Sequence, residues 1–280
     1  MCRTSRLNCI IPPYLLKKLL ESEDSEVRQA ALDTMLTTAR LRVSERFGRP
    51  SPARPPLVRV GAPSSTARRS FLPFAVMART EDGPESADES VNRAFDGLGL
   101  TRDFYKEVFQ RNSIDGRGMR LEGYVHFGMK FENAFWDGRQ MVFGDGDGKR
   151  FGNLTGSLDV IAHELTHGVT DHTSGFEYHN QSGALNESMS DVFGSLVKQW
   201  SLKQLAEEAD WLIGADVWTP EIDADALRSM KAPGHAYNNA LFGKDPQPDR
   251  MSKFIHLPDN EDGTTAGCTS TPVFRTRRSS

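Results

Sequence analysis

The stretch His163-Glu164-Leu165-Thr166-His167 contains the residues whose types and spacing most clearly indicate chemistry. Residues four apart share a helix face, so His163 and His167 can present their imidazole nitrogens to one metal ion. Glu164 would lie close to that ion without binding it, where a general base for a metal-activated water belongs. Apolar residues at positions 158, 160 and 161 favour a buried helix for this segment.

Two acidic residues downstream extend this pattern. Catalytic zinc has three protein ligands and an open fourth position, and two histidines with one glutamate are a common set. Glu187 is the candidate third ligand, on a second apolar-periodic helix that opens at Gly183. Asp191, one helical turn further on, can accept the second N–H of a zinc-bound histidine and fix its tautomer. The alternative for this acidic pair is an exposed helix start, where carboxylates suit the helix dipole.

The motifs together resemble the thermolysin family of zinc metalloendopeptidases. The likeness is carried by HELTHGVTDHTSGFEYHNQSGALNESMSDVFGSLV, by the preceding NAFWDGRQMVFGDGDGKRF and by the spacing from His167 to Glu187. It extends from about Val91 to Asp262. The resemblance implies one catalytic Zn²⁺ bound by His163, His167 and Glu187. It also makes Glu164 the general base and Asp191 the residue that orients a ligand.

The same resemblance implies residues that handle the substrate, a protein or peptide. Tyr178 matches a tyrosine that helps to hold the oxyanion, a role in which one preorganised donor contributes about 3 kcal/mol. Asn133, Ala134 and Trp136 match a strand segment that binds substrate backbone, and Arg228 matches an arginine that contacts a substrate carbonyl. An extended edge segment can pair with a peptide by strand addition. The alternative for this segment is an ordinary strand before a turn.

The expected fold class is α+β. It comprises a zincin-type catalytic domain with an active-site helix and a small mixed β-sheet, plus the truncated start of an α-helical C-terminal domain.

Helical spacing near 14–22 and 26–47 predicts a helical propeptide over 1–47. A linker and maturation region follows over 48–87, in which the Pro-, Arg- and Ser-rich residues 49–69 read as an exposed linker. We place the catalytic domain at 88–206, with a first helix from Asp88 to Gln110 and short strands at 123–127 and 134–143. The partial helical domain covers 207–262, and a tail outside the family covers 263–280.

The N-terminal segment indicates a precursor. Its Ile11-Pro12-Pro13-Tyr14 sequence resembles the short propeptides of the protealysin-like branch of the family. This implies that the chain's own propeptide inhibits the enzyme until it is removed, by a cut between the linker and about Ala87. A Cys9 thiolate that caps the zinc of the precursor is an alternative, since a thiolate placed at the site binds zinc well.

Composition sets broader limits. A formal charge of −4 and a pI near 6.0 give no basis for nucleic-acid binding. Three scattered cysteines, Cys2, Cys9 and Cys268, indicate neither a disulfide framework nor a cysteine-rich metal site. No apolar run is long enough for a membrane span. Family resemblance favours secretion, whereas the N-terminus is a poor signal peptide, which leaves retention in the cytoplasm open.

Calcium is a second possible ion. The acidic turn at 144–148 lacks the spacing and terminal glutamate of an EF-hand loop and reads as a solvated turn. The family's double calcium site is bound partly by an aspartate matching Asp159 and by a glutamate where this chain has Lys198. Because an ammonium repels a dication, we expect this double site to be absent or impaired.

The genetic code can explain why residues 263–280 do not resemble the family. When the reading frame is shifted at Gly263, the codons from there to Thr276 can encode DNGGVHINSGIPN, which resembles the family segment whose histidine stabilises the tetrahedral intermediate. We therefore predict that residues 263–280 are a frameshift product.

Two functions are therefore expected as alternatives. One is a zinc metalloendopeptidase made as a propeptide-bearing precursor; the other is a catalytically impaired, zinc-binding remnant of such a protease.

Overall fold

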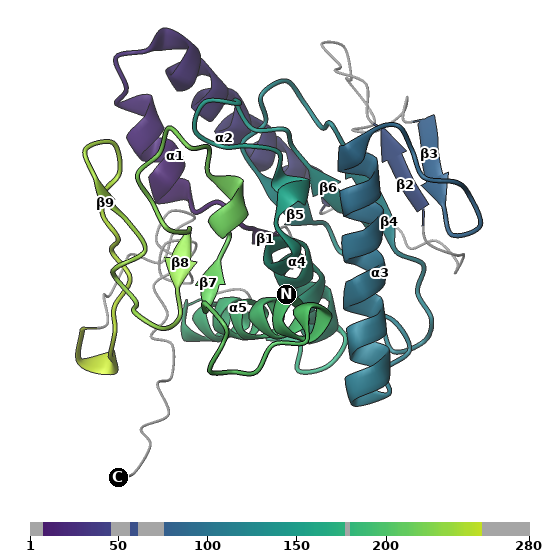
Figure 1. Cartoon of the computed structure of the whole chain (residues 1–280). Coiled ribbons are helices and arrows are strands. Elements are labelled where there is room, and N and C mark those ends of the chain that lie inside the picture. The colour runs from purple at the N-terminus through teal and green to yellow at the C-terminus, as the bar shows by residue number, and fades with distance from the viewer. Residues whose placement is uncertain (1–7, 46–56, 61–75, 177–179, 254–280) are drawn as a thin grey trace.

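The computed structural model describes residues 8–45, 57–60, 76–176 and 180–253. A six-stranded sheet and five α-helices over this part of the chain form an α+β architecture (Figure 1). This confirms the expected fold class and its small mixed sheet. None of the helices described combines the length and the apolar character needed to cross a bilayer.

The middle of the sheet is built from β5 (Ala134–Trp136), β6 (Met141–Phe143) and β4 (Glu122–Val125). Strand β6 pairs antiparallel with β5 and parallel with β4. The full order is β1-β5-β6-β4-β2-β3. Strand β1 (Asn8–Cys9) pairs antiparallel with β5, so the predicted propeptide extends one edge of the sheet.

The predicted linker contains a strand, which corrects the expectation of an exposed linker over 49–69. Strand β2 (Leu57–Val60) pairs parallel with β4 and antiparallel with β3 (Val76–Thr80). Its residues, Leu57-Val58-Arg59-Val60, include two β-branched valines that favour a strand. Because the residues on both sides are rich in proline, arginine and serine, this four-residue strand was not predicted from the sequence.

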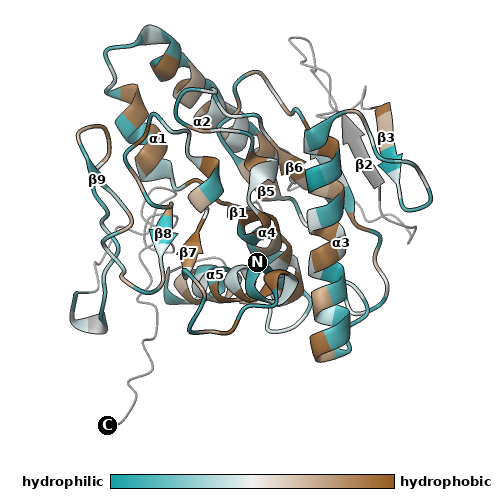
Figure 2. Cartoon of the chain, in the orientation of Figure 1, coloured by the Kyte–Doolittle hydropathy of each residue, from teal (hydrophilic) through white to brown (hydrophobic). Residues whose placement is uncertain are grey.

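Helix α3 (Glu89–Phe109) fits the predicted first helix of the catalytic domain closely. The side chain of Asp88 caps it by accepting a hydrogen bond from the Ser90 N–H. It ends where Gln110 adopts a left-handed φ of 54°. Hydrophobic and hydrophilic positions alternate round α3 (Figure 2), and its apolar face packs on α4.

Helices α4 (Leu158–Asp171) and α5 (Asn180–Leu202) carry the chemistry predicted from the sequence and pack on each other. Their close approach depends on Gly194 of α5. A Cβ atom at that position would lie 2.6 Å from the carbonyl oxygen of Asp159 and 3.4 Å from the Cβ of His163. The small glycine therefore sets the distance between the two helices beside the predicted metal ligands.

The propeptide segment folds into α1 (Pro13–Leu20) and α2 (Ser25–Glu45), which lie together on one side of the molecule (Figure 1). Proline at the first position of α1 suits a helix start, because that N–H has no partner within the helix. Leu15 and Leu19 of α1 and Val27 and Ala31 of α2 join the main apolar core. The described part of the predicted propeptide is thus packed into the folded chain.

After α5 the described chain is mostly irregular up to residue 253. It contains short strand pairs, β7 (Leu212–Ile213) with β8 (Arg228–Ser229) and β9 (Asn238–Asn239) with β10 (Gly243–Lys244). Three short 3₁₀ turns complete the structure, η1 (Leu154–Gly156), η2 (Ala215–Val217) and η3 (Met251–Lys253). Strand β8 matters most, because it presents Arg228. The domain boundary at 206–207 stays a prediction.

Candidate active site

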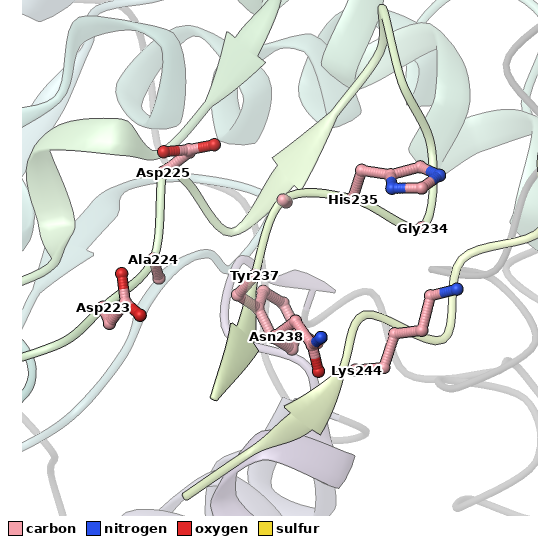
Figure 3. Close-up of a pocket in the computed structure, with 9 residues that line it drawn as sticks. Asp223, Ala224, Asp225, Gly234, His235, Tyr237, Asn238 and Lys244 are labelled. Atoms are coloured by element: carbon pink, nitrogen blue, oxygen red, sulfur yellow. The ribbon is translucent and has the colours of Figure 1, made fainter. Parts of the chain in front are cut away.

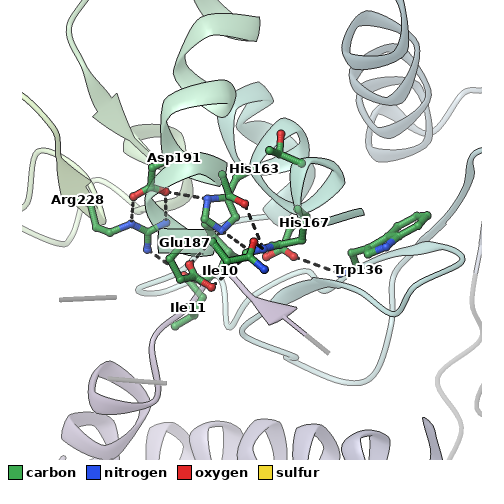
Figure 4. Close-up of polar contacts among 12 residues, drawn as sticks. Ile10, Ile11, Trp136, His163, His167, Glu187, Asp191 and Arg228 are labelled. Atoms are coloured by element: carbon green, nitrogen blue, oxygen red, sulfur yellow. Dashed lines mark hydrogen bonds and ion pairs between the residues drawn. The ribbon is translucent and has the colours of Figure 1, made fainter. Parts of the chain in front are cut away.

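Three predicted metal ligands meet in the protein interior (Figure 4). The Nε2 atoms of His163 and His167, one turn apart on α4, are 3.0 Å from each other. The carboxylate of Glu187, from α5, places one oxygen 3.3 Å from His163 Nε2 and the other 3.4 Å from His167 Nε2. All three residues are buried. Two imidazole nitrogens and one carboxylate that converge in this way fit Zn²⁺.

The other ring nitrogen of each histidine has its own partner. His163 Nδ1 lies 2.7 Å from Asp191 Oδ1, as expected from the sequence. His167 Nδ1 lies 2.8 Å from the side-chain oxygen of Asn186, and the Ser190 hydroxyl lies 3.1 Å away. A proton held on each Nδ1 leaves both Nε2 atoms free to bind a metal. Sequence reasoning missed Asn186 and Ser190, although both lie within one turn of Glu187.

The charges around the histidines favour a bound cation. Burial alone would lower the pKa of His163, but the carboxylates of Asp191 and Glu187 raise it to about 10. Burial opposes ionisation of Glu187, yet His167, His163 and Arg228 lower its pKa to about 2. In Asp191 the effect of burial is likewise outweighed, chiefly by Arg228, so its pKa stays far below the usual range. Two buried carboxylates therefore remain charged beside the histidines.

Glu164 is placed as a base requires. Its Oε2 accepts a hydrogen bond of 3.2 Å from the backbone N–H of Trp136, which ties α4 to β5. Its Oε1 is buried and has no hydrogen-bond partner among the described residues. Burial raises the pKa of this carboxyl well above its ordinary value. One carboxyl oxygen is thus fixed and the other is available for a water or a substrate.

The predicted propeptide lies along the residues predicted to bind substrate backbone. The N–H of Ile10 donates to the Ala134 carbonyl at 3.3 Å, and the N–H of Ile11 donates to Asn133 Oδ1 at 3.0 Å. Arg228 Nη1 donates to the carbonyl of Ile10 at 3.3 Å. Farther along β1, Asn8 pairs with Trp136. The four predicted substrate-binding residues therefore contact or pair with one extended stretch of the propeptide.

Comparison with known proteins agrees with this geometry. Residues 81–171 match the family model described as thermolysin metallopeptidase, catalytic domain, and residues 174–272 match its alpha-helical domain. The chain is 45% identical over 262 residues to an extracellular metalloprotease of Pectobacterium carotovorum subsp. carotovorum, covering 91% of this chain and 73% of that protein. The chain belongs to the thermolysin family of metallopeptidases.

Other members of the family show the same relationship. Protease PrtS of Photorhabdus sp. is 42% identical over 263 residues, which cover 89% of this chain and 68% of that protein. Among solved structures, the precursor of protealysin from Serratia proteamaculans superposes with a TM-score of 0.78 at 42% identity, covering 92% of this chain and 76% of that one. The expected metalloendopeptidase family and protealysin-like branch are thus confirmed.

Tyr178 and Cys9 are two further residues that the sequence suggested for the thermolysin-like site. Tyr178 lies outside the described residues, so its role stays a prediction. Cys9 is buried with aromatic residues of β4, β5 and the loop between them, among them Tyr124 and Phe135. It is not part of the group that could hold a metal in the described chain. The alternative of a Cys9 thiolate bound to zinc is therefore not supported.

Lys198 occupies the position where the thermolysin family was expected to have a calcium-binding glutamate. Its Nζ lies 3.4 Å from a carboxylate oxygen of the buried Asp159 and 3.1 Å from one of Asp210. Burial alone would lower the pKa of Lys198, but these carboxylates raise it. A lysine charge thus lies beside Asp159, the carboxylate expected to bind calcium, and beside Asp210.

A separate surface hollow of about 410 Å³ lies beside β9 and is lined by Asp223, Asp225, His235 and Lys244, among others (Figure 3). Tyr237 also lines it and donates a hydrogen bond to the hydroxyl of Tyr14 on α1. Its lining has charges of both signs. None of the site residues predicted from the sequence borders it.

Proposed function

We propose that this chain is a zinc-dependent metalloendopeptidase made as a precursor, in which its own N-terminal segment occupies the substrate cleft. The observation that carries this proposal is the buried convergence of His163, His167 and Glu187 beside Glu164. Its substrates are proteins or peptides. The named extracellular relative supports secretion as its location.

Zinc held by these three residues would supply a Lewis acid and a water of lowered pKa. Glu164 then accepts the proton of the attacking water through its unpartnered Oε1. The same carboxyl group then delivers that proton to the leaving amine. Asp191 holds the His163 ring in place. Tyr178 is the proposed donor to the oxyanion.

Substrate placement follows from the contacts of the propeptide. Asn133 and Ala134 accept hydrogen bonds from backbone N–H groups, and Arg228 donates to a backbone carbonyl. A peptide bound in this manner would add a strand to β5. The side chain of Ile10 is fully buried in the same apolar cluster as Leu227. This supports a preference for an apolar residue after the scissile bond.

Hydrolysis of casein and of a chromogenic peptide by the zinc-loaded chain, compared with Glu164→Gln after the N-terminal segment has been removed from both, tests the catalytic proposal. Glu164→Gln should keep about one zinc per chain and lose about 10²–10⁴-fold in turnover, because it lacks the general base. Glu187→Gln should lose zinc as well. Hydrolysis that persists in EDTA would refute the metal mechanism. Zinc retention with equal rates in both proteins would favour the alternative, a catalytically impaired remnant.

Inhibition by the propeptide has its own test in Ile10→Ala. Truncation of a fully buried isoleucine costs about 2–5 kcal/mol, which should loosen the segment in the cleft. Binding of a fluorescent peptide hydroxamate to the zinc-loaded precursor should therefore become tighter. Leu32→Ala, at an exposed position of α2, is the matched control. Equal binding by all three proteins would mean that the segment does not block the cleft.

A further inference from the structure

Glu132 is a buried acid that the proposed catalytic mechanism does not use. It immediately precedes Asn133, which binds the propeptide backbone. Its exposed fraction is 0%, and neither oxygen of its carboxyl group has a hydrogen-bond partner among the described residues. A buried carboxyl group in such a position is costly to ionise, because it has lost water and gained nothing in exchange.

The propeptide helix α2 is what lies against this residue. The N–H of Glu132 donates to the hydroxyl of Thr34 at 3.0 Å. Thr34 and Thr38 are one turn apart on the buried side of α2, and the Thr38 hydroxyl is itself buried without a partner. Helix α2 thus contacts the backbone of the buried Glu132, yet gives its carboxyl group no hydrogen bond.

The charges nearby do not compensate for this burial. Across from Glu132, Asp147 repels a carboxylate, and the guanidinium of Arg150 is engaged with Asp147 at 2.8 Å. On α2 and the turn before it, the acidic Glu26 and Asp24 face Lys130 and Lys149 of the catalytic domain. Burial, with a smaller effect of Asp147, raises the pKa of Glu132 to about 8.

We propose that Glu132 is a proton-dependent latch for the propeptide: its neutral form lets α2 stay docked, and its ionisation favours release of α2. The inference rests on the proposed role of residues 1–47 as an inhibitory propeptide. It adds a regulatory input, external pH, that acts away from the zinc ligands.

The direction of the pH effect follows from linkage. The pKa of Glu132 is about 8 when α2 is docked, against an ordinary value of 4.5 once water reaches it. The docked state therefore binds the proton more tightly. Docking is unaffected below about pH 4.5, weakens by up to about tenfold per pH unit as the pH rises towards 8, and is constant above that.

Hydrogen–deuterium exchange of α2 in the full chain tests the latch, in a Glu164→Gln background that prevents self-cleavage. The ratio of the opening constant of this protein to that of its Glu132→Gln variant cancels the intrinsic pH dependence of exchange. It also cancels other groups that titrate in both proteins, notably His126, which lies between Asp88 and Asp145. We expect the ratio to rise at least tenfold between pH 5 and pH 8.

Lys130→Ala is the matched control at the same interface, since it removes a charge pair with Glu26 without changing a group that titrates in this range. It should change the opening constant by about two- to fivefold at every pH. A wild-type to Glu132→Gln ratio that does not change with pH would overturn the proposal. Because no catalysis is measured, a chain that lacked peptidase activity could still show the latch.

Discussion

Asp191 joins a predicted metal ligand to a predicted substrate-binding residue. Its Oδ1 lies 2.7 Å from His163 Nδ1, while both of its oxygens accept hydrogen bonds of 2.8 Å from Arg228 (Figure 4). The guanidinium in turn reaches the Ile10 carbonyl of the propeptide. One buried carboxylate thus fixes the orientation of a predicted zinc ligand and of a predicted substrate-binding residue.

Asp191→Asn should weaken both functions. An amide cannot neutralise buried Arg228, and the loss of one partner of a buried ion pair costs about 3–5 kcal/mol of folding free energy. Loss of the carboxylate paired with Nδ1 of a predicted ligand histidine should reduce zinc affinity by about 10–100-fold. Urea unfolding and competition with a zinc chelator measure the two effects. Asp96→Asn, which alters a half-exposed pair with Arg79, should leave both unchanged.

Gly194→Ala tests whether the spacing of α4 and α5 controls the metal centre. Its new methyl group would lie 2.6 Å from the Asp159 carbonyl oxygen, a backbone atom that cannot turn aside. We expect a loss of about 1–3 kcal/mol in stability, together with weaker zinc binding, because His163 must move relative to Glu187.

Gly99→Ala is the matched control for that change. A Cβ at Gly99 meets nothing within 4 Å, although this glycine is also helical. The substitution should stabilise the protein by up to about 1 kcal/mol, as alanine favours helix over glycine. Equal effects at the two glycines would contradict the steric explanation.

The sequence predicted the parts of the site that depend on helical spacing. His163, His167, Glu187 and Asp191 are positioned by two helices, and both the ligand pattern and the apolar periodicity were visible there. It also predicted α3 almost to the residue, since Asp88 is a strong N-cap. Residue spacing within a helix and the residue at its N-cap were enough to predict these features.

Features that depend on distant contacts could not be predicted in this way. Strand β2 is only four residues long and forms because β3 and β4 flank it. Glu132 donates its backbone N–H to Thr34 of α2, about a hundred residues away in sequence. The second partner of Asp191, Arg228, comes from a short strand with no periodicity of its own.

The proposed frameshift at Gly263 concerns residues outside the described structure. The match to the alpha-helical domain model continues to residue 272, into the tail that was placed outside the family. Sequencing of the gene downstream of codon 262 tests the proposal. We expect a single-base change that restores DNGGVHINSGIPN when corrected. Codons that cannot encode this segment in the shifted frame would refute it.

The charge of Lys198 determines the calcium dependence that we expect for this chain. Its ammonium group already lies among the carboxylates of Asp159 and Asp210, so added Ca²⁺ should change the thermal midpoint of the chain by less than about 1 °C relative to EGTA. Lys198→Glu replaces that charge with a further carboxylate. The variant should melt lower than the parent in EGTA, because three acidic groups then repel one another, and should recover in calcium. At 100 times its dissociation constant, bound calcium contributes about 2.7 kcal/mol, or about 5–10 °C for a protein of this size. Lys203→Glu, at an exposed position beyond α5, should show no such recovery. A parent chain that gains several degrees in calcium would mean that Lys198 does not replace the ion.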